Sequence, residues 1–219
     1  MGTLVISLPA LLKGLFTTAA LSITICTLGT ALACLLVAAD LEGGVVTKGV
    51  IKCYVKLFKS IPPLALLIWL HYAIPSNSIF QLTAFSSSVI ALTLNIAPFL
   101  ADAIRSGINS VPASQYDSAK ILGFNKQTIL LIVIFPQVIR NSISDISSWF
   151  ITVIKLTSLT SIIGLNELMH TGNTIISETF MPLEIYTGIA CIYIIVVFLS
   201  EALIFALARF IPKLLTTGL

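Results

Sequence analysis

Charged residues are scarce in this sequence. Asp, Glu, Lys and Arg account for 10% of its 219 residues, whereas hydrophobic residues account for 57% and the mean hydropathy is +1.06. A soluble domain usually carries roughly 25% charged residues. The composition therefore excludes an ordinary soluble domain and indicates an integral membrane protein. Its apolar runs are continuous and do not alternate with polar residues, so we expect helices and not a transmembrane β-barrel.

Motifs for chemistry are also missing. The sequence has no C-x-x-C pair and no G-x-x-x-x-G-K-[ST] run that would cradle ATP. No group of His, Cys and acidic residues has the spacing of a metal or catalytic site, so we expect neither an enzyme nor a bound cofactor. The basic residues behind the net charge of +3 lie beside apolar segments, which argues against a nucleic-acid partner. We interpret the four cysteines as plain thiols: Cys26, Cys34, Cys53 and Cys191.

The apolar segments predict one all-α transmembrane domain over residues 1–219. The chain is long enough for about five spans of roughly 20 residues with their connections. The first apolar segment is too long for the hydrophobic part of a signal peptide, so we interpret it as a span. The turn between the second and third spans is predicted at Pro75-Ser76-Asn77-Ser78. The expected spans are 14–39, 60–75, 79–101, 129–154 and 185–208.

Several features interrupt these segments. Residues 155–184 are too apolar for a solvated loop and too broken for a full span, so we expect a re-entrant or pore-capping segment. Within the third span, Pro98 is expected to kink the helix or to free a backbone carbonyl. Arg140 and Asp145 interrupt the fourth span. Because charges are expensive in hydrocarbon, this span is expected to face protein or a water-filled cavity.

Basic residues are distributed unevenly among the connections. Residues 40–59, 102–128 and 209–219 hold nine of the twelve Lys and Arg residues, whereas 71–80 and 156–184 hold none. Cytoplasmic connections carry the excess of Lys and Arg. We therefore predict that the N-terminus is outside and that the C-terminus and the connection at 102–128 are cytoplasmic. Four lysines share one face of a predicted surface helix, either as topology anchors or as a site for anionic lipid: Lys48, Lys52, Lys56 and Lys59.

A short polar helix is predicted at 113–123, within the connecting segment 110–128. Pro112 suits its first position, since the missing N–H of proline would be unpaired there. Gly123 suits the residue just after its end, where a left-handed backbone costs least. Asn125 can then cap the next helix. A polar helix held between two spans at the membrane surface is shaped to be bound by another protein.

The residues around this helix have a distinctive spacing. Asp117-Ser118-Ala119 is followed after three residues by Gly123, and after nine more by Val133, one residue and Phe135-Pro136. This resembles the signature of ABC importer permeases, Glu-Ala-Ala, three residues, Gly, nine residues, Ile, one residue, Leu-Pro. In that family the loop is the coupling helix, which is seated in a groove of the ATPase subunit. The resemblance implies ATPase coupling through Asp117, Ser118, Ala119, Gly123 and Pro136.

Further runs are similar to the permeases of polar amino acid importers. The likeness covers about residues 11–209 and rests on the runs 101–108, 110–112, 136–140 and 163–168. Two other runs, 59–62 and 97–99, look more like methionine-type importer permeases. The resemblance implies a multi-pass subunit of the bacterial inner membrane that forms the translocation path as a homo- or heterodimer. The implied partners are a pair of ABC ATPase subunits holding ATP and Mg²⁺, an extracytoplasmic solute-binding protein, an amino acid substrate and the lipid bilayer.

Polar residues in the third span and after the fourth are candidates for the solute path. The Asn95 amide can hydrogen-bond a zwitterion or a neighbouring helix. Lys155 can meet a carboxylate, or its ammonium can reach the outer interface. Polar amino acid permeases commonly read Lys-Asp-Thr-Ser-Leu where this chain has Leu156 in place of the acid, which argues against a strongly cationic substrate unless Glu167 or a partner supplies a carboxylate. The candidates are Asn95, Lys155, Thr157 and Ser158.

Two classes of function fit these observations. The first is the permease subunit of an ATP-driven importer for amino acids, with methionine or another less polar amino acid as the alternative substrate. The second is an ATP-independent channel, carrier or structural membrane subunit. That second class would be expected to have lost the spacing at 113–128, which is intact. We interpret His71 and His170 as interface or structural residues under either function.

Overall fold

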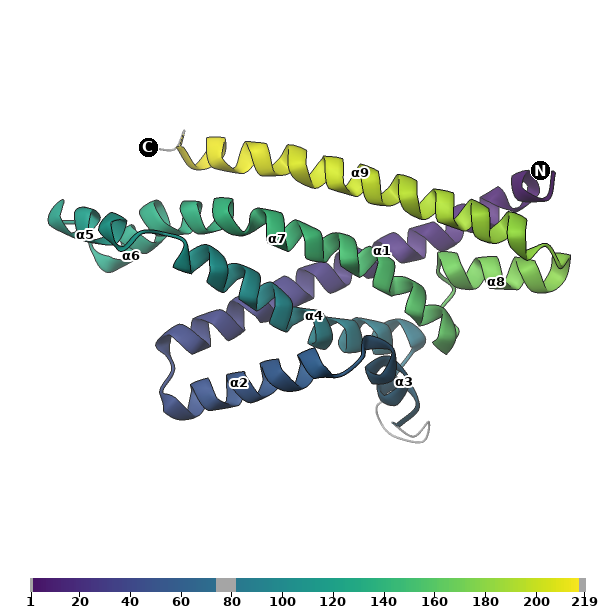
Figure 1. Ribbon diagram of the computed structural model, residues 1–219, viewed down its shortest axis with the longest axis horizontal. Coiled ribbons are helices and arrows are strands. Elements are labelled where there is room, and N and C mark those ends of the chain that lie inside the picture. The colour runs from purple at the N-terminus through teal and green to yellow at the C-terminus, as the bar shows by residue number, and fades with distance from the viewer. Residues whose placement is uncertain (1, 74–81, 217–219) are drawn as a thin grey trace.

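The computed structural model describes residues 2–73 and 82–216, with side chains over 6–73 and 82–206 (Figure 1). Helices account for most of this part of the chain, and it holds no strand. The predicted turn at Pro75-Ser76-Asn77-Ser78 lies outside the described residues. In chain order the elements are α1 (Gly2–Glu42), α2 (Val45–Ser60), α3 (Pro63–Ala73), α4 (Ala84–Asn109), α5 (Ala113–Ile121), α6 (Lys126–Thr128), the π-helix η1 (Ile129–Ile134), α7 (Phe135–Leu156), the 3₁₀-helix η2 (Thr157–Ile163), α8 (Leu168–Thr179) and α9 (Pro182–Thr216).

Four helical stretches are long and apolar enough to cross a membrane, and α2 and α3 together would make a fifth. The four stretches are Ile6–Glu42, Ala84–Asn109, Lys126–Ile163 and Pro182–Ala206. This confirms the predicted all-α membrane protein with about five spans. All four helical stretches are longer than the predicted spans, because a helix does not stop where its apolar run stops.

The second predicted span, at 60–75, is not one straight helix. α3 has 11 residues, which corresponds to about 16 Å and is too short to cross the hydrocarbon alone. Ile61 is extended, with φ −85° and ψ 125°, because a residue before proline is pushed out of the helical region. Pro62 and Pro63 follow, and α2 and α3 meet at an angle of 100°. α2, which we predicted as a surface helix leading into the span, therefore forms a bent unit with α3.

Pro98 frees a backbone carbonyl, as the sequence predicted. α4 continues through Pro98, but the carbonyl of Leu94 lacks its usual helical N–H because proline has none. The hydroxyl of Tyr54, on α2, donates to that carbonyl at 2.9 Å. The break in the hydrogen bonding of α4 is therefore repaired from the neighbouring helix.

Asn95 performs the reciprocal repair. Pro62 leaves the carbonyl of Phe58 in α2 without its helical donor. The Nδ2 atom of Asn95, in α4, donates to that carbonyl at 3.0 Å and to the carbonyl of Ile61 at 3.2 Å. The sequence predicted that Asn95 hydrogen-bonds either a solute or a neighbouring helix. In this conformation its contacts are those of the helix–helix hydrogen bond.

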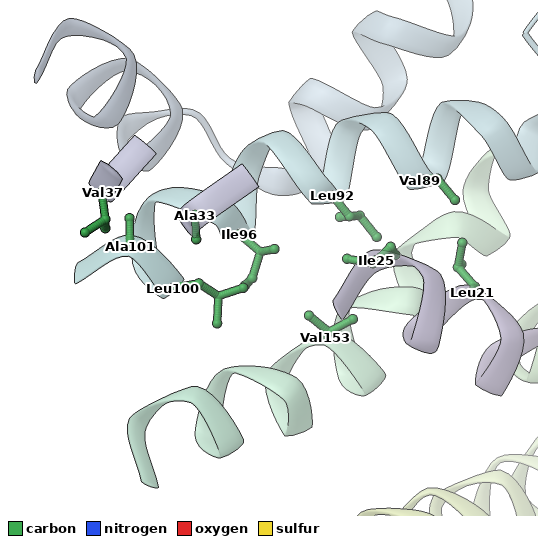
Figure 2. Close-up of a cluster of buried hydrophobic side chains, with 10 residues drawn as sticks. All are labelled: Leu21, Ile25, Ala33, Val37, Val89, Leu92, Ile96, Leu100, Ala101 and Val153. Carbon is green, nitrogen blue, oxygen red and sulfur yellow. The ribbon is translucent and has the colours of Figure 1, made fainter. Parts of the chain in front are cut away.

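The main core joins α1, α4 and α7 (Figure 2). Gly29 of α1 permits a close approach: a Cβ at this position would lie 2.9 Å from Cγ2 of Ile96 and 3.3 Å from Cδ1 of Leu100 in α4. The contact is one of small and branched residues, which suits helix pairs in a bilayer. Its buried members are Leu21, Ile25, Ala33 and Val37 of α1, Val89, Leu92, Ile96, Leu100 and Ala101 of α4, and Val153 of α7.

The predicted re-entrant segment folds as η2, a short turn and α8, packed on α1 and α9. Glu167 is fully buried and caps α8, accepting hydrogen bonds from the backbone N–H groups of Met169 and His170 at 2.9 and 2.7 Å. The hydroxyl of Tyr193 in α9 donates to the same carboxylate at 3.2 Å, and that of Thr18 in α1 at 3.5 Å. Burial raises the pKa of the Glu167 carboxyl, and these hydrogen bonds oppose the rise. Whether the segment is re-entrant in the bilayer stays a prediction.

The two ends of the molecule differ. α5 and α6 lie at one end, where α9 also finishes, whereas α8 and the N-terminal part of α1 lie at the other (Figure 1). α4 and α7 lie side by side and run in opposite directions: α4 leads to the α5 end, and α7 runs from that end toward α8 (Figure 1). The predicted coupling helix and the predicted pore-capping segment are therefore separated by the length of the spans.

Candidate functional site

The short polar helix forms where the sequence placed it. α5 runs from Ala113 to Ile121, and Pro112 caps it in an extended conformation, one residue before the position predicted for it. Gly123 has φ +82°, the left-handed conformation that glycine adopts at least cost. The N–H groups of Gly123 and Phe124 donate to the carbonyls of Lys120 and Ala119, a Schellman motif that fixes the direction of the exit.

Apolar side chains are exposed at the end of this helix. The exposed fraction is 85% for Ile121 and 73% for Leu122, and Phe124 and Tyr116 are also exposed. Of the α5 residues, Ala119 is the one buried. A polar helix that presents adjoining large apolar side chains has the character of a protein-binding surface, because such patches are otherwise covered. Asp117 and Ser118 lie on the exposed part of the same helix.

The entry to the following span is irregular. Asn125 caps it as predicted: its Oδ1 accepts a hydrogen bond from the Thr128 backbone N–H at 2.8 Å. Six residues then form the π-helix η1, which ends just before Phe135 and Pro136. The Nε2 atom of Gln137 donates to the carbonyl of Val133 at 2.8 Å and so covers a carbonyl near the irregular turn. π-Helical turns inside longer helices are frequent at functional sites.

The candidates for the solute path lie in different surroundings. Asn95 is 4% exposed, with its amide nitrogen bonded to backbone as described above. The Thr157 hydroxyl is buried and donates to the carbonyl of Ile154, and that of Ser158 donates to the carbonyl of Lys155. The Lys155 side chain is exposed. Their part in solute transfer stays a prediction.

A cleft of about 480 Å³ lies between α4 and α7. None of the four predicted path residues lines it. Sequence reasoning noted Asp145 as an expensive charge in a span but did not connect it with α4. The signal was the spacing along α7, where polar residues recur every three or four positions. Lining residues include Phe99, Asp102 and Ser106 of α4, and Asp145, Ser148, Trp149 and Thr152 of α7.

An ion-pair network borders the cleft. Lys59 of α2 pairs with Asp102, and its ammonium lies 5.1 Å from the centre of the Phe99 ring. Arg105 pairs with Asp102 at 3.5 Å and with Asp40 of α1 at 3.1 Å. The network therefore links three helices, α1, α2 and α4, at one side of the cleft. Within the part of the chain that the structure describes, no group of His, Cys, Asp and Glu has the arrangement of a metal site.

Both histidines make local contacts. Nδ1 of His71 is 3.0 Å from the Ser87 hydroxyl, and Nδ1 of His170 is 3.2 Å from the carbonyl of Ser161. Each contact joins two neighbouring elements, which agrees with the interface or structural role that the sequence predicted for both histidines.

Comparison with known proteins identifies relatives that match most of the chain. The L-cystine transport system permease protein TcyB of Bacillus subtilis (strain 168) is 34% identical over 192 residues, which cover 87% of this chain and 82% of that protein. The probable glutamine ABC transporter permease protein GlnM of the same organism is 29% identical over 142 residues, 65% of each chain. The match to that relative thus spans about two thirds of its length.

Solved structures share the architecture. The crystal structure of an amino acid ABC transporter with histidines matches with a TM-score of 0.85 and 26% identity, over 94% of this chain and 95% of that one. An inward-facing structure of the MetNI methionine ABC transporter matches with a TM-score of 0.78 over 92% of this chain and 96% of that one, at 16% identity, a likeness of fold.

The family model described as "Binding-protein-dependent transport system inner membrane component" matches residues 31–213. That range includes α5 with its exposed apolar end, the π-helical entry to the following span, and the cleft between α4 and α7. The sequence resemblance, the helical architecture and this match agree, and the chain belongs to the family of inner-membrane components of binding-protein-dependent transport systems.

Proposed function

We propose that this chain is the permease subunit of an ATP-driven importer for amino acids, and that α5 is the helix through which it is coupled to a separate ATPase. The observation that carries the proposal is the exposed apolar end of α5, where Ile121 and Leu122 are exposed at the end of a helix that is otherwise polar. The intact spacing from Asp117 to Pro136 supports the same assignment. Two of the relatives compared above are named as permeases for cystine and glutamine, which supports an amino acid as the solute.

The proposed mechanism uses the rigid exit from α5. ATP-driven closure of two ATPase subunits pushes on one coupling helix in each of two permease copies. The Schellman turn at Gly123 and the capped start at Asn125 pass this motion into α7 without a flexible joint. Five spans do not enclose a path alone, so two copies, identical or related, are expected to pair about a twofold axis. Their relative movement then opens the path alternately to the two sides.

The proposal assigns the remaining components to partners. ATP and Mg²⁺ belong to the ATPase subunits, and this chain binds neither them nor another cofactor. An extracytoplasmic solute-binding protein delivers the amino acid at the α8 end. The α5 end is cytoplasmic, in agreement with the Lys and Arg residues of α2, the α5 connection and the C-terminal helix.

The test is co-purification of an ATPase subunit with the chain from its native membrane, compared between Gly123→Asp and Gly49→Asp. Both glycines have open space around them, but only Gly123 has a left-handed backbone. We expect Gly123→Asp to lose the ATPase, or to keep it without ATP-driven uptake, while Gly49→Asp retains both. Normal uptake by Gly123→Asp would overturn the coupling role of α5.

The same experiment addresses the ATP-independent carrier or structural subunit. If the unaltered chain purifies without an ATPase, and its transport does not depend on ATP, that second function replaces the importer. If an ATPase is present, uptake of L-cystine, L-glutamine, L-arginine and L-methionine by the reconstituted complex then identifies the solute.

A further inference from the structure

The geometry points to the cleft between α4 and α7 as a binding station for the ammonium or guanidinium end of the transported solute, with Asp145 as its counter-charge. This inference rests on the proposed function, since it takes the cleft to lie on the solute path. It assigns a cation-recognising role to Asp145, Trp149 and Phe99, none of which the sequence analysis placed on that path.

The face of α7 that carries Asp145 is the polar face of a membrane span. Its residues follow intervals of four, three, four and three, so they lie in one row along the helix. A row of polar side chains that ends in a lysine does not face hydrocarbon, because the charged members alone would be too costly there. The face therefore borders water, protein or solute. The row consists of Asn141, Asp145, Ser148, Thr152 and Lys155.

Asp145 is the acidic residue of this row, and it has no cationic partner among the described residues. Among the described residues, the cations near the cleft, Lys59 and Arg105, pair with Asp102 and Asp40, and no cation pairs with Asp145. Its side chain is exposed in the single chain and lines the cleft. An intramembrane carboxylate without a partner in its own chain calls for a cation from elsewhere.

Two residues that line the cleft, Phe99 and Asp102, already contact one ammonium group, the chain's own. Lys59 lies over the ring of Phe99 and pairs with Asp102, so an aromatic face and a carboxylate together hold its Nζ atom. The second half of the cleft repeats these elements. Trp149 stacks against Phe99 with the ring centres 4.3 Å apart, and Asp145 lies on the same helix one turn away. The cleft wall thus offers an aromatic ring with a carboxylate in two places, and Lys59 occupies one of them.

Two hydroxyl groups of the cleft, those of Ser148 and Thr152, favour a hydrogen-bond donor as the ligand. The Ser148 hydroxyl donates to the carbonyl of Ser144 at 3.0 Å, and that of Thr152 donates to the carbonyl of Ser148 at 2.8 Å. Their hydrogens are used, so their oxygens remain as acceptors. A carboxylate and two such hydroxyls complement a group with several donors and no acceptor, which describes an ammonium or a guanidinium. The indole N–H of Trp149 adds one donor, suited to a carboxylate of the same solute.

Asp145 also supplies a carboxylate, which the sequence lacks at position 156. Leu156 stands where a carboxylate is usual, and that absence argued against a cationic substrate. Asp145 lies 11 residues earlier on the same helix, about 16 Å along its axis, so a carboxylate is present but displaced toward the α5 end. We therefore infer that a cationic group is stabilised in the cleft and not beside Lys155.

The test measures the charge preference of the cleft directly, in the complete transporter with its four native cysteines replaced. A reporter cysteine at Ser148, about 6 Å from Asp145 on the helix surface, is modified with a cationic trimethylammonium-ethyl or an anionic sulfonato-ethyl methanethiosulfonate. A unit charge at that distance in water changes the rate of a singly charged reagent roughly threefold. We expect the cationic reagent to be preferred, and Asp145→Asn to reduce the ratio of the two rates roughly tenfold.

Glu201 provides the matched comparison. It lies on α9 and shares a second cleft with Ser148, so it is an acid near the reporter that does not line the α4–α7 cleft. We expect Glu201→Gln to leave most of the preference in place. A ratio near one in the unaltered transporter, or a ratio that responds to Glu201→Gln and not to Asp145→Asn, would overturn the proposal.

A second measurement distinguishes a binding station from a merely negative surface. Butylammonium and butyrate have the same length and opposite charge, and each is added during labelling of the Ser148→Cys reporter. We expect butylammonium to slow modification more than butyrate, and Asp145→Asn to remove that difference. Equal protection by both ions would exclude ammonium recognition. If the ATPase co-purifies and Gly123→Asp uncouples it while these results fail, the importer stands and the cleft assignment alone is wrong.

Discussion

Asn95 shows at the scale of one residue how a polar side chain in a membrane helix can be structural. Its Nδ2 atom donates to two carbonyls at the bend between α2 and α3, where Pro62 has removed the helical donor. Tyr54 of α2 makes the reciprocal contact, because its hydroxyl donates to the α4 carbonyl that Pro98 has freed. In hydrocarbon no water is present to donate a hydrogen bond to such carbonyls. Each helix therefore depends on the other to compensate for its proline.

We predict that Asn95→Ala lowers the free energy of unfolding in detergent by about 1–3 kcal/mol, because it leaves buried carbonyls unpaired. Asn109→Ala is the control: it lies in the same helix but is exposed, and its effect is expected to stay within about 0.5 kcal/mol. Denaturant titration followed by tryptophan fluorescence measures both. If Asn95→Ala unfolds like the unaltered chain yet loses uptake, its role is contact with solute instead.

Single residues with one strong physical reason were predictable from the sequence. Gly123 needs a left-handed backbone, Asn125 caps the helix that follows, and Pro98 frees a carbonyl, and the structure confirms all three. The partners of Asn95 were not predictable, because its acceptors lie more than 30 positions away and depend on how α2 crosses α4. For the same reason, the sequence did not show that Asp145 lines one cleft together with Phe99 of α4.

At the scale of elements, the close approach of α1 and α4 depends on Gly29. The space for a side chain is filled by Ile96 and Leu100, which belong to the main core (Figure 2). Small residues are the usual means by which membrane helices approach, since little hydrophobic driving force exists between helices already in lipid. Gly29 and Ala33 have the spacing of a small-residue pair in the sequence, but that spacing does not identify α4 as the helix they meet.

We predict that Gly29→Leu destabilises the α1–α4 pair by about 1–3 kcal/mol, because a branched side chain in a filled contact forces neighbours out of their rotamers. The control is Gly49→Leu, at a position of α2 with open space around it, which is expected to change stability little. Thermal unfolding of the purified chain in detergent compares the two variants. Equal unfolding temperatures would show that the α1–α4 contact is looser than the structure has it.

Element boundaries were the least predictable part of the fold. Hydropathy marks where apolar residues stop, but α1 and α4 continue into polar residues because helical hydrogen bonding propagates beyond the hydrocarbon. The bend of 100° between α2 and α3 was not predicted, although Pro62-Pro63 marked its place. Proline excludes a straight helix but does not specify the angle of the bend. That angle is fixed by packing on α4 and by Asn95.

At the scale of the whole molecule, the two ends carry different chemistry. The α5 end has the Schellman turn, the exposed Ile121 and Leu122, and the basic residues of the flanking segments. The α8 end has a buried acid that ties three helices together and no Lys or Arg over 156–184. Under the proposed function, in which a partner binds the exposed apolar side chains at the α5 end, the tightly bonded segment at the other end suits the molecule to transmit a movement along its helices.

The orientation of these ends is the prediction with the widest consequence, because coupling, solute delivery and the direction of transport all depend on it. We expect a cysteine introduced at Ile121 to react with a membrane-impermeant maleimide only in inside-out vesicles, and one at Ser177 of α8 only in right-side-out vesicles. Both positions are exposed, and the native cysteines are replaced in each variant. Added ATPase subunit should then protect Ile121→Cys and leave Ser177→Cys reactive. Labelling of Ile121→Cys from outside would place the coupling helix on the side without ATP, and the importer mechanism would fail with it.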